Sequence, residues 1–251
     1  MVVPAAQTRR IGSAVYGLAM IAFAVECFVR FDGVPQLEPF PAWLGMRPAL
    51  AVISGVVLLL GGILINARRL APRGALALAV LFGIWLIALQ LPIVLANPAN
   101  GGKWVVFFEV LAIDAAAWWL SSGLMREEGA TSNLWPGIAL AARIAFGLSF
   151  LAFGISHFMY HGYVESVIPG WIPAHKFFTY FTACAHIAAG LAILSRVRDR
   201  LAATLLGVMF GSWVLIVHLP RVAANPTHAN EWTSLIVALA MCGAGFLFAS
   251  R

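Results

Sequence analysis

Eight long apolar runs dominate this sequence and constrain its fold more than any other feature. Each run is close to the roughly 20 residues that a helix needs to cross a bilayer. Charged residues make up only 10% of the chain, against about 25% in soluble domains. We therefore expect an all-α, polytopic membrane protein without a separate soluble domain. The expected spans cover approximately residues 11–30, 49–66, 75–95, 104–125, 138–159, 177–195, 201–218 and 232–250.

The basic residues predict how the chain is oriented in the membrane. Of the 16 Lys and Arg residues, eleven lie in the N-terminal tail, at the even-numbered connections and at the C-terminus, and five lie at the odd-numbered connections. Lys and Arg accumulate on the cytoplasmic side of membrane proteins, so both termini are predicted to be cytoplasmic. The charges form small clusters between apolar runs and no basic face, so the net charge of +6 does not indicate a nucleic-acid partner.

The chain also repeats itself at an offset of 128 residues. Four spans make one unit, so the two units share an orientation and are expected to be related by a pseudo-two-fold axis along the membrane normal. We predict two tandem four-helix bundles side by side, formed by residues 1–130 and 131–251. The matching pairs include Phe82 and Phe210, Trp85 and Trp213, Leu91 and Leu219, Pro92 and Pro220, and Trp104 and Trp232.

Each half carries a Leu-Pro pair that is followed closely by Asn-Pro, at residues 91–98 and 219–226. Proline interrupts helix interiors, and asparagine bonds its own backbone in turns. We therefore expect structured turns that end the third and seventh spans. Trp104 and Trp232, which follow these turns, suit the aromatic belt of a membrane interface.

Three features of the second half resemble a known family. They are an FxxxGxxHF-like stretch at residues 150–158, a loop rich in Pro and Trp at 168–173, and a run of small residues at 188–192. Together they resemble the DoxX-like family of bacterial membrane proteins, which is similar to the DoxD subunit of thiosulfate:quinone oxidoreductase. The resemblance covers the chain twice. It implies a four-helix unit, a multi-pass protein of the bacterial inner (plasma) membrane and an association with redox complexes, and it assigns no roles to residues.

Ionisable residues at bilayer depth cost about 2.5–3.5 kcal/mol on insertion scales, so they mark candidate functional sites. In this chain, acids fall in the first half and imidazoles in the second. His157, His186 and His218 are the candidate catalytic residues. Thr182 lies four residues before His186 and shares its helix face. That polar stripe is either a hydrogen-bonded seam between helices or the wall of a ligand path.

His157 and His161 are four residues apart and are expected to share one face near the outer end of the fifth span. With His218 as a third ligand they would form a metal site. The alternative places His161 in the headgroup region and leaves His157 as a lone donor between helices, and we assign no residue to a metal. Two histidines can also ligate haem iron, but His157 and His186 are expected to lie at different depths.

Two acids in the first half are candidates for a proton path. Glu26 lies near the outer surface and could instead pair with Arg30, four residues later on the same helix. Asp114 lies nearer the centre of the fourth span and has no basic partner in its own helix. Glu109 points about 140° away from Asp114 on that helix, so these two carboxyl groups are not expected to act as a pair.

From these observations we predict an integral membrane component of an oxidoreductase system, which binds a quinone or another lipophilic redox partner near the outer side of the second half. His161, Thr182 and Trp171 are the further candidate contacts to such a ligand. The alternative is a non-catalytic scaffold or a carrier of a small hydrophobic ligand. The expected partners are the lipid bilayer and a membrane or soluble redox protein. Convergence of His157, His186 and His218 on one cavity would favour the first hypothesis, and dispersal would favour the second.

Overall fold

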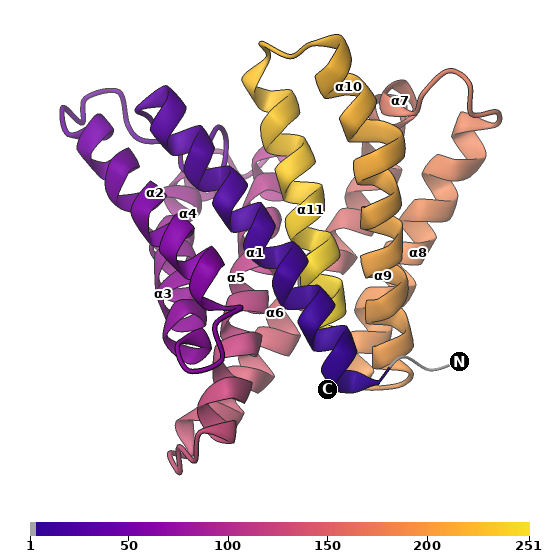
Figure 1. Ribbon diagram of the computed structural model, residues 1–251. Coiled ribbons are helices and arrows are strands. Elements are labelled where there is room, and N and C mark those ends of the chain that lie inside the picture. The colour runs from indigo at the N-terminus through magenta and orange to yellow at the C-terminus, as the bar shows by residue number, and fades with distance from the viewer. Residues whose placement is uncertain (1–3) are drawn as a thin grey trace.

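A computed structural model describes residues 4–251, and this part of the chain is helical without a strand. Eight helical spans in the described range are long and apolar enough to cross a membrane, which confirms the predicted fold class. The start of α1 and the C-terminus lie at the same end of the molecule (Figure 1); the cytoplasmic location of both termini stays a prediction. The helices are α1 (Ala5–Arg30), α2 (Arg47–Leu64), α3 (Ala71–Ile84), α4 (Leu91–Ala96), α5 (Gly101–Glu127), α6 (Leu134–Met159), α7 (His161–Val167), α8 (His175–Ser195), α9 (Asp199–Trp213), α10 (Leu219–Ala224) and α11 (Ala229–Ala249).

The third and seventh spans continue further than the sequence predicts. α3 passes through the π-helical segment Trp85–Gln90 into α4, and α9 passes through the π-helical segment Val214–His218 into α10. Pro92 and Pro220 therefore do not end their spans, and each stands near the start of the short helix that follows the π turn. A π turn changes the backbone hydrogen-bond pattern, so the helix can continue past a residue that has no N–H to donate.

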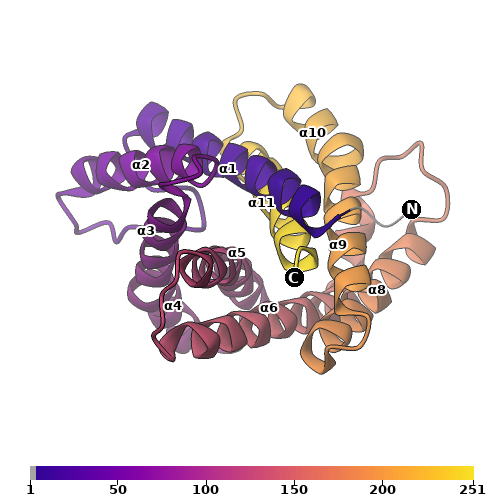
Figure 2. The ribbon, with the colours of Figure 1, turned by 60° about the horizontal axis from the view of Figure 1, so that its bottom comes forward.

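The other spans form a ring around α5 and α11, which contact each other in its interior (Figure 2). These two are the most buried spans: 61% of the residues in the most apolar part of α5 are buried, and 72% in that of α11. α1 packs against α2 and α11, while α6 packs against α8 and α5. The first helix of each half thus packs on the last helix of the other half. We expected two bundles that lie side by side. In the structure the two halves share extensive contacts, between α1 and α11 and between α5 and α6.

Close helix crossings occur at corresponding places in the two halves. A Cβ atom added to Gly62 of α2 would lie 2.7 Å from the carbonyl oxygen of Gly17 in α1. A Cβ atom added to Gly190 of α8 would lie 2.7 Å from the carbonyl oxygen of Gly147 in α6. Small residues allow such close approach between helices in membranes. The second crossing holds α6 tightly against α8, the two helices that carry His157 and His186.

Aromatic packing joins the central helices to the ring near the end that holds the termini. Phe248 of α11 stacks on Trp119 of α5, with ring centroids 4.7 Å apart, and on Phe146 of α6, with centroids 3.9 Å apart. The indole N–H of Trp119 donates to the carbonyl oxygen of Leu247 at 3.1 Å. This end of the molecule is filled by side chains, and the space for a ligand lies toward the other end.

Candidate functional site

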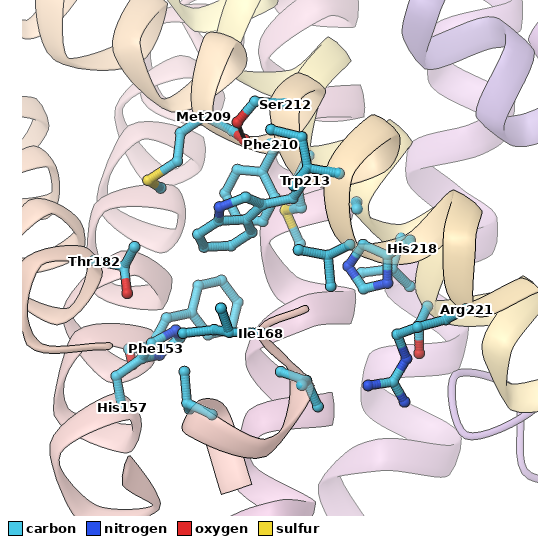
Figure 3. Close-up of a pocket in the computed structure, with 18 of the residues that line it drawn as sticks. Phe153, His157, Ile168, Thr182, Met209, Phe210, Ser212, Trp213, His218 and Arg221 are labelled. Atoms are coloured by element: carbon cyan, nitrogen blue, oxygen red, sulfur yellow. Dashed lines mark hydrogen bonds between the residues drawn. The ribbon is translucent and has the colours of Figure 1, made fainter. Parts of the chain in front are cut away.

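A cavity of about 660 Å³ lies among α6, α8, α9 and α11 in the second half. Helix α7 and the segment that follows it border the cavity at the end away from the termini, through Val164, Ile168 and Trp171. Figure 3 shows part of the lining, in which aromatic and aliphatic side chains alternate with a few polar groups. Its volume falls within the range of about 300–1,000 Å³ that is typical of small-molecule sites.

The structure brings five of the predicted site residues to this one cavity. They are His157, His186, His218, Thr182 and Trp171. The three histidines come from three different spans, so they converge through the tertiary fold and not through proximity in the sequence. Convergence of these histidines on one cavity is the arrangement that we expected to favour the oxidoreductase component over the scaffold or carrier.

His157 and His186 form the inner polar contact of the cavity. The Nδ1–H of His157 donates to the carbonyl oxygen of Phe153 at 2.9 Å, and since a carbonyl can only accept, the proton is on Nδ1. His186 is only 1% exposed, and neither of its ring nitrogens has a hydrogen-bond partner in the described chain. The two imidazole rings meet edge to face, with centroids 4.9 Å apart. Because buried polar groups are nearly always hydrogen-bonded, His186 needs an explanation.

The contact between His157 and His186 corrects the expected difference in their depth, and it excludes a haem bound between the two rings. His157 and His186 do not lie at different depths, because α6 and α8 place their rings in direct contact. Axial ligands must stand on opposite faces of a haem. Two rings that touch leave no space for a porphyrin plane between them, so the pair does not form a bis-histidine haem site in this arrangement.

His161 does not line the cavity. α6 ends before Tyr160, which has φ −113° and ψ 32°, and His161 begins the separate helix α7. The prediction that His157 and His161 share a helix face is therefore wrong, because the helix breaks between them. The His161 ring is half exposed and its Nδ1 lies 3.4 Å from the carboxylate of Glu165. In the described part of the chain, no three His, Cys, Asp or Glu residues are placed to hold a metal ion, so the site with His218 is not formed.

His218 lies across the cavity from His157 (Figure 3). It is the last residue of its π-helical segment, and its Nδ1 is buried with no hydrogen-bond partner among residues 4–251. Arg221, three residues later, also lines the cavity. The guanidinium group of Arg221 donates to both carboxylate oxygens of Glu231, at 2.7 and 2.8 Å. This ion pair ties α10 to α11 beside the cavity.

Two hydroxyl groups in the lining already use their protons within their own helices. The Oγ1–H of Thr182 donates to the carbonyl oxygen of Phe178 at 2.9 Å, and the Oγ–H of Ser212 donates to that of Met209 at 2.7 Å. A hydroxyl that donates its proton still has lone pairs that can accept. Thr182 and Ser212 are therefore suited to accept hydrogen bonds from a ligand.

The two predicted proton-path acids have different positions relative to the cavity. Glu26 accepts hydrogen bonds from the hydroxyl of Thr233, at 3.0 and 3.2 Å to its two oxygens, and Thr233 lines the cavity. The expected alternative, an ion pair of Glu26 with Arg30, does not form within the described range. Asp114 is 7% exposed in α5 and does not line the cavity. Of these two acids, only Glu26 is hydrogen-bonded to a residue that lines the cavity.

An aromatic cage around His186 was not predicted as part of the site. The ring centroids of Phe150, Phe153, Phe210 and Trp213 lie 5.7, 6.0, 5.9 and 5.6 Å from the centroid of His186. Phe210 and Trp213 belong to the internal repeat, which was the available signal. Their place beside His186 depends on the course of the seventh span, which the sequence does not specify.

The first half also contributes to the cavity, through Gln36, Leu37, Val105 and Glu109. The first two come from the connection between α1 and α2, and the others come from the outer part of α5. The cavity therefore lies at the junction of the halves and is not confined to the second one. No signal in the sequence indicated that the first connection reaches across the molecule.

The second half matches a known family. The model of the DoxX family matches residues 138–219, which include His157, His186 and His218. This confirms the DoxX-like resemblance in that part of the chain and, with the eight apolar helices, supports a multi-pass membrane protein. No curated protein and no solved structure matches the chain significantly.

Proposed function

We propose that this protein is an integral component of an oxidoreductase system of the bacterial inner membrane, and that it binds a quinone or a similar lipophilic compound in the cavity of the second half. One observation carries the proposal: three histidines from separate helices converge on an apolar cavity large enough for such a molecule. Apolar surroundings accommodate the ring and the tail of a quinone. The imidazoles provide the small number of polar groups that fix its orientation.

Histidine suits this task because its ordinary pKa lies near neutrality, and a neutral imidazole can donate at one nitrogen and accept at the other. His157 donates through Nδ1 to Phe153, so its Nε2 can accept a hydrogen bond, as from a quinol hydroxyl. His186 has no partner for either nitrogen in the described chain. Reduction of a quinone consumes two electrons and two protons. A redox partner protein would supply the electrons, and these side chains would orient the oxygens and exchange protons with them.

A route from the bilayer supports a lipid-soluble ligand. Phe178 and Phe181 of α8 line the cavity, yet they are 39% and 56% exposed on the outside of the ring. Met209 and Ser212 of α9 line the same region. α8 and α9 are joined by a short connection and separate toward their other ends (Figure 1). We place the entrance for the ligand between these two helices.

Direct binding of a short-chain alkyl benzoquinone to the purified full-length protein in nanodiscs tests the proposal. His186→Leu is the informative variant, because Leu58 occupies the equivalent position of the first half and is fully buried there. Loss of one ligand hydrogen bond should weaken binding about tenfold. His161→Leu makes the same chemical change outside the cavity and should bind as the wild type does. Absence of binding by the wild type, or equal binding by all three proteins, would overturn the proposal.

A second candidate is a carrier of a small hydrophobic ligand that performs no redox chemistry. It is favoured by the absence of a hydrogen-bonded acid beside His186 in the described chain, because proton transfer at that ring then needs the ligand itself. The redox state of the quinone pool in host membranes separates the two candidates. The oxidoreductase proposal expects His186→Leu to change that state. An unchanged pool with intact quinone binding in the wild type would favour the carrier.

A further inference from the structure

Gln90 and His218 occupy corresponding positions in the two halves. Each is the last residue of a π-helical segment and each precedes Leu-Pro. The short helices that follow end at asparagines with the same backbone conformation, φ −134° and ψ 57° at Asn97 and φ −134° and ψ 63° at Asn225. The local structure around one residue can therefore be compared directly with that around the other.

In the first half, a segment of the chain itself fills the space beside Gln90. The side-chain amide of Gln90 donates to the carbonyl oxygens of Gln36 and Leu37, at 2.7 and 2.8 Å. Leu37 is 1% exposed and belongs to the same core as Trp85. The neighbouring Glu38 is 2% exposed and accepts a hydrogen bond from the hydroxyl of Ser54. The polar group of Gln90 thus binds two backbone carbonyls, and an apolar side chain packs beside them.

In the second half, the space beside His218 and Trp213 is the cavity. The connection that would correspond to the filling segment forms helix α7 instead, and Val164 and Ile168 border the cavity without closing it. His218 forms no hydrogen bond with the described residues, and its Nδ1 is buried. The fully buried His186 faces the same cavity without a partner. The space that a chain segment fills beside Gln90 in the first half is therefore an open cavity beside His218 in the second.

We infer that the ligand of this cavity places a carbonyl oxygen against the ring N–H of His218, as the carbonyls of Gln36 and Leu37 lie against the amide of Gln90. The inference rests on the proposed function and makes it more specific. The apolar body of the ligand packs against Phe210 and Trp213, as Leu37 packs in the core that contains Trp85. An imidazole always carries at least one N–H, so it can donate in either charge state. His218 is thus a specificity-determining residue that selects lipophilic carbonyl compounds over hydrocarbons of equal size.

Two variants and two probes test this inference in the full-length protein in nanodiscs. The probes are an alkyl benzoquinone and the alkylbenzene with the same chain, which lacks both carbonyl groups. His218→Gln installs the donor that Gln90 provides in the first half, so the benzoquinone should bind within about threefold of the wild-type affinity. His218→Leu removes the donor and should weaken benzoquinone binding about tenfold, the equivalent of one hydrogen bond. Neither change should alter binding of the alkylbenzene by more than about twofold.

The outcomes separate this inference from the proposed function. If the wild type binds the benzoquinone and His218→Leu binds it equally well, the carbonyl does not contact His218, and the inference is overturned while quinone binding stands. If the wild type binds neither probe, both proposals are overturned. If His218→Leu does not fold, the comparison of the two probes on the wild type and on His218→Gln decides. Equal affinity for the benzoquinone and the alkylbenzene in these two proteins would then overturn the inference.

Discussion

Replacing Gln90 by leucine should destabilise the protein by about 1–3 kcal/mol, because it leaves a buried backbone acceptor without a donor. Gln90 is 2% exposed, and its amide donates to the carbonyl oxygens of Gln36 and Leu37 at 2.7 and 2.8 Å. Leu37 is itself 1% exposed, so water cannot replace the lost donor at its carbonyl without opening the loop. The carbonyl of Gln36 is nearer the surface and should add less to the cost.

The free energy of unfolding in mixed micelles, followed by tryptophan fluorescence over an SDS titration, measures the global effect. Hydrogen exchange of the backbone amides over residues 33–38 measures the local one. Both should respond to Gln90→Leu, because the amide of Gln90 anchors this segment. Exchange in the aromatic core around Trp119 and Phe248 should stay unchanged, because this core lies near the other end of the molecule.

The matched control is His218→Leu at the corresponding position. His218 forms no hydrogen bond with the described residues, so this substitution leaves no protein acceptor unpaired and should cost less than about 0.5 kcal/mol. Equal losses of unfolding free energy in Gln90→Leu and His218→Leu would refute the reasoning, since the two side chains would then stabilise the fold equally. Unchanged exchange over residues 33–38 in Gln90→Leu would refute it too.

Three further predictions concern buried groups in the two halves. Burial raises the pKa of Glu38 from 4.5 to about 7. Between these pH values the folded protein keeps a proton that the unfolded chain releases, so the free energy of unfolding should fall as the pH rises from 4.5 to 7. The same pH titration of the Glu38→Gln variant should lack that fall. Gly190→Ala should cost about 1–3 kcal/mol through overpacking, measured by SDS titration, whereas Gly137→Ala should not destabilise, since no atom lies within 4 Å of a Cβ added there. Thr233→Val removes the donor to the buried carboxyl of Glu26 and should cost about 1–3 kcal/mol in the same assay; a Thr233→Val protein as stable as the wild type would contradict this.

Much of the fold follows from the sequence because the membrane imposes strict rules. Each spanning segment must satisfy its own backbone hydrogen bonds and must be apolar over its length, so eight apolar runs predicted eight helices. Polar side chains inside such helices turn toward protein or toward a cavity. The same rule selected His157, His186 and His218 as site candidates, and the structure places all three in one lining.

The sequence could not predict features that depend on contacts between segments. Residues 157–161 contain no proline and no glycine, and Gly162 follows only after the break at Tyr160 that separates His161 from His157. Pro92 and Pro220 are ordinary helix-ending signals, and only the π turns before them allow the spans to continue. The small-residue faces of α1 and α6 pack against α2 and α8. These contacts are compatible with two separate bundles and with the observed ring. The ring is therefore decided by packing across the halves.

The difference between the halves bears on why histidines are present at all. A buried polar group without a partner costs about 1–3 kcal/mol, and the second half keeps His186 and His218 in that condition. The corresponding positions of the first half differ, because Leu58 is apolar and the side-chain N–H groups of Gln90 donate to two backbone carbonyls. No segment of the described chain offers such carbonyls beside His218, so stability alone would favour an apolar side chain at both places in the second half. Histidines at these positions are explained if a ligand with hydrogen-bonding groups binds in the cavity, because its hydrogen bonds would offset the cost of the unpartnered ring nitrogens.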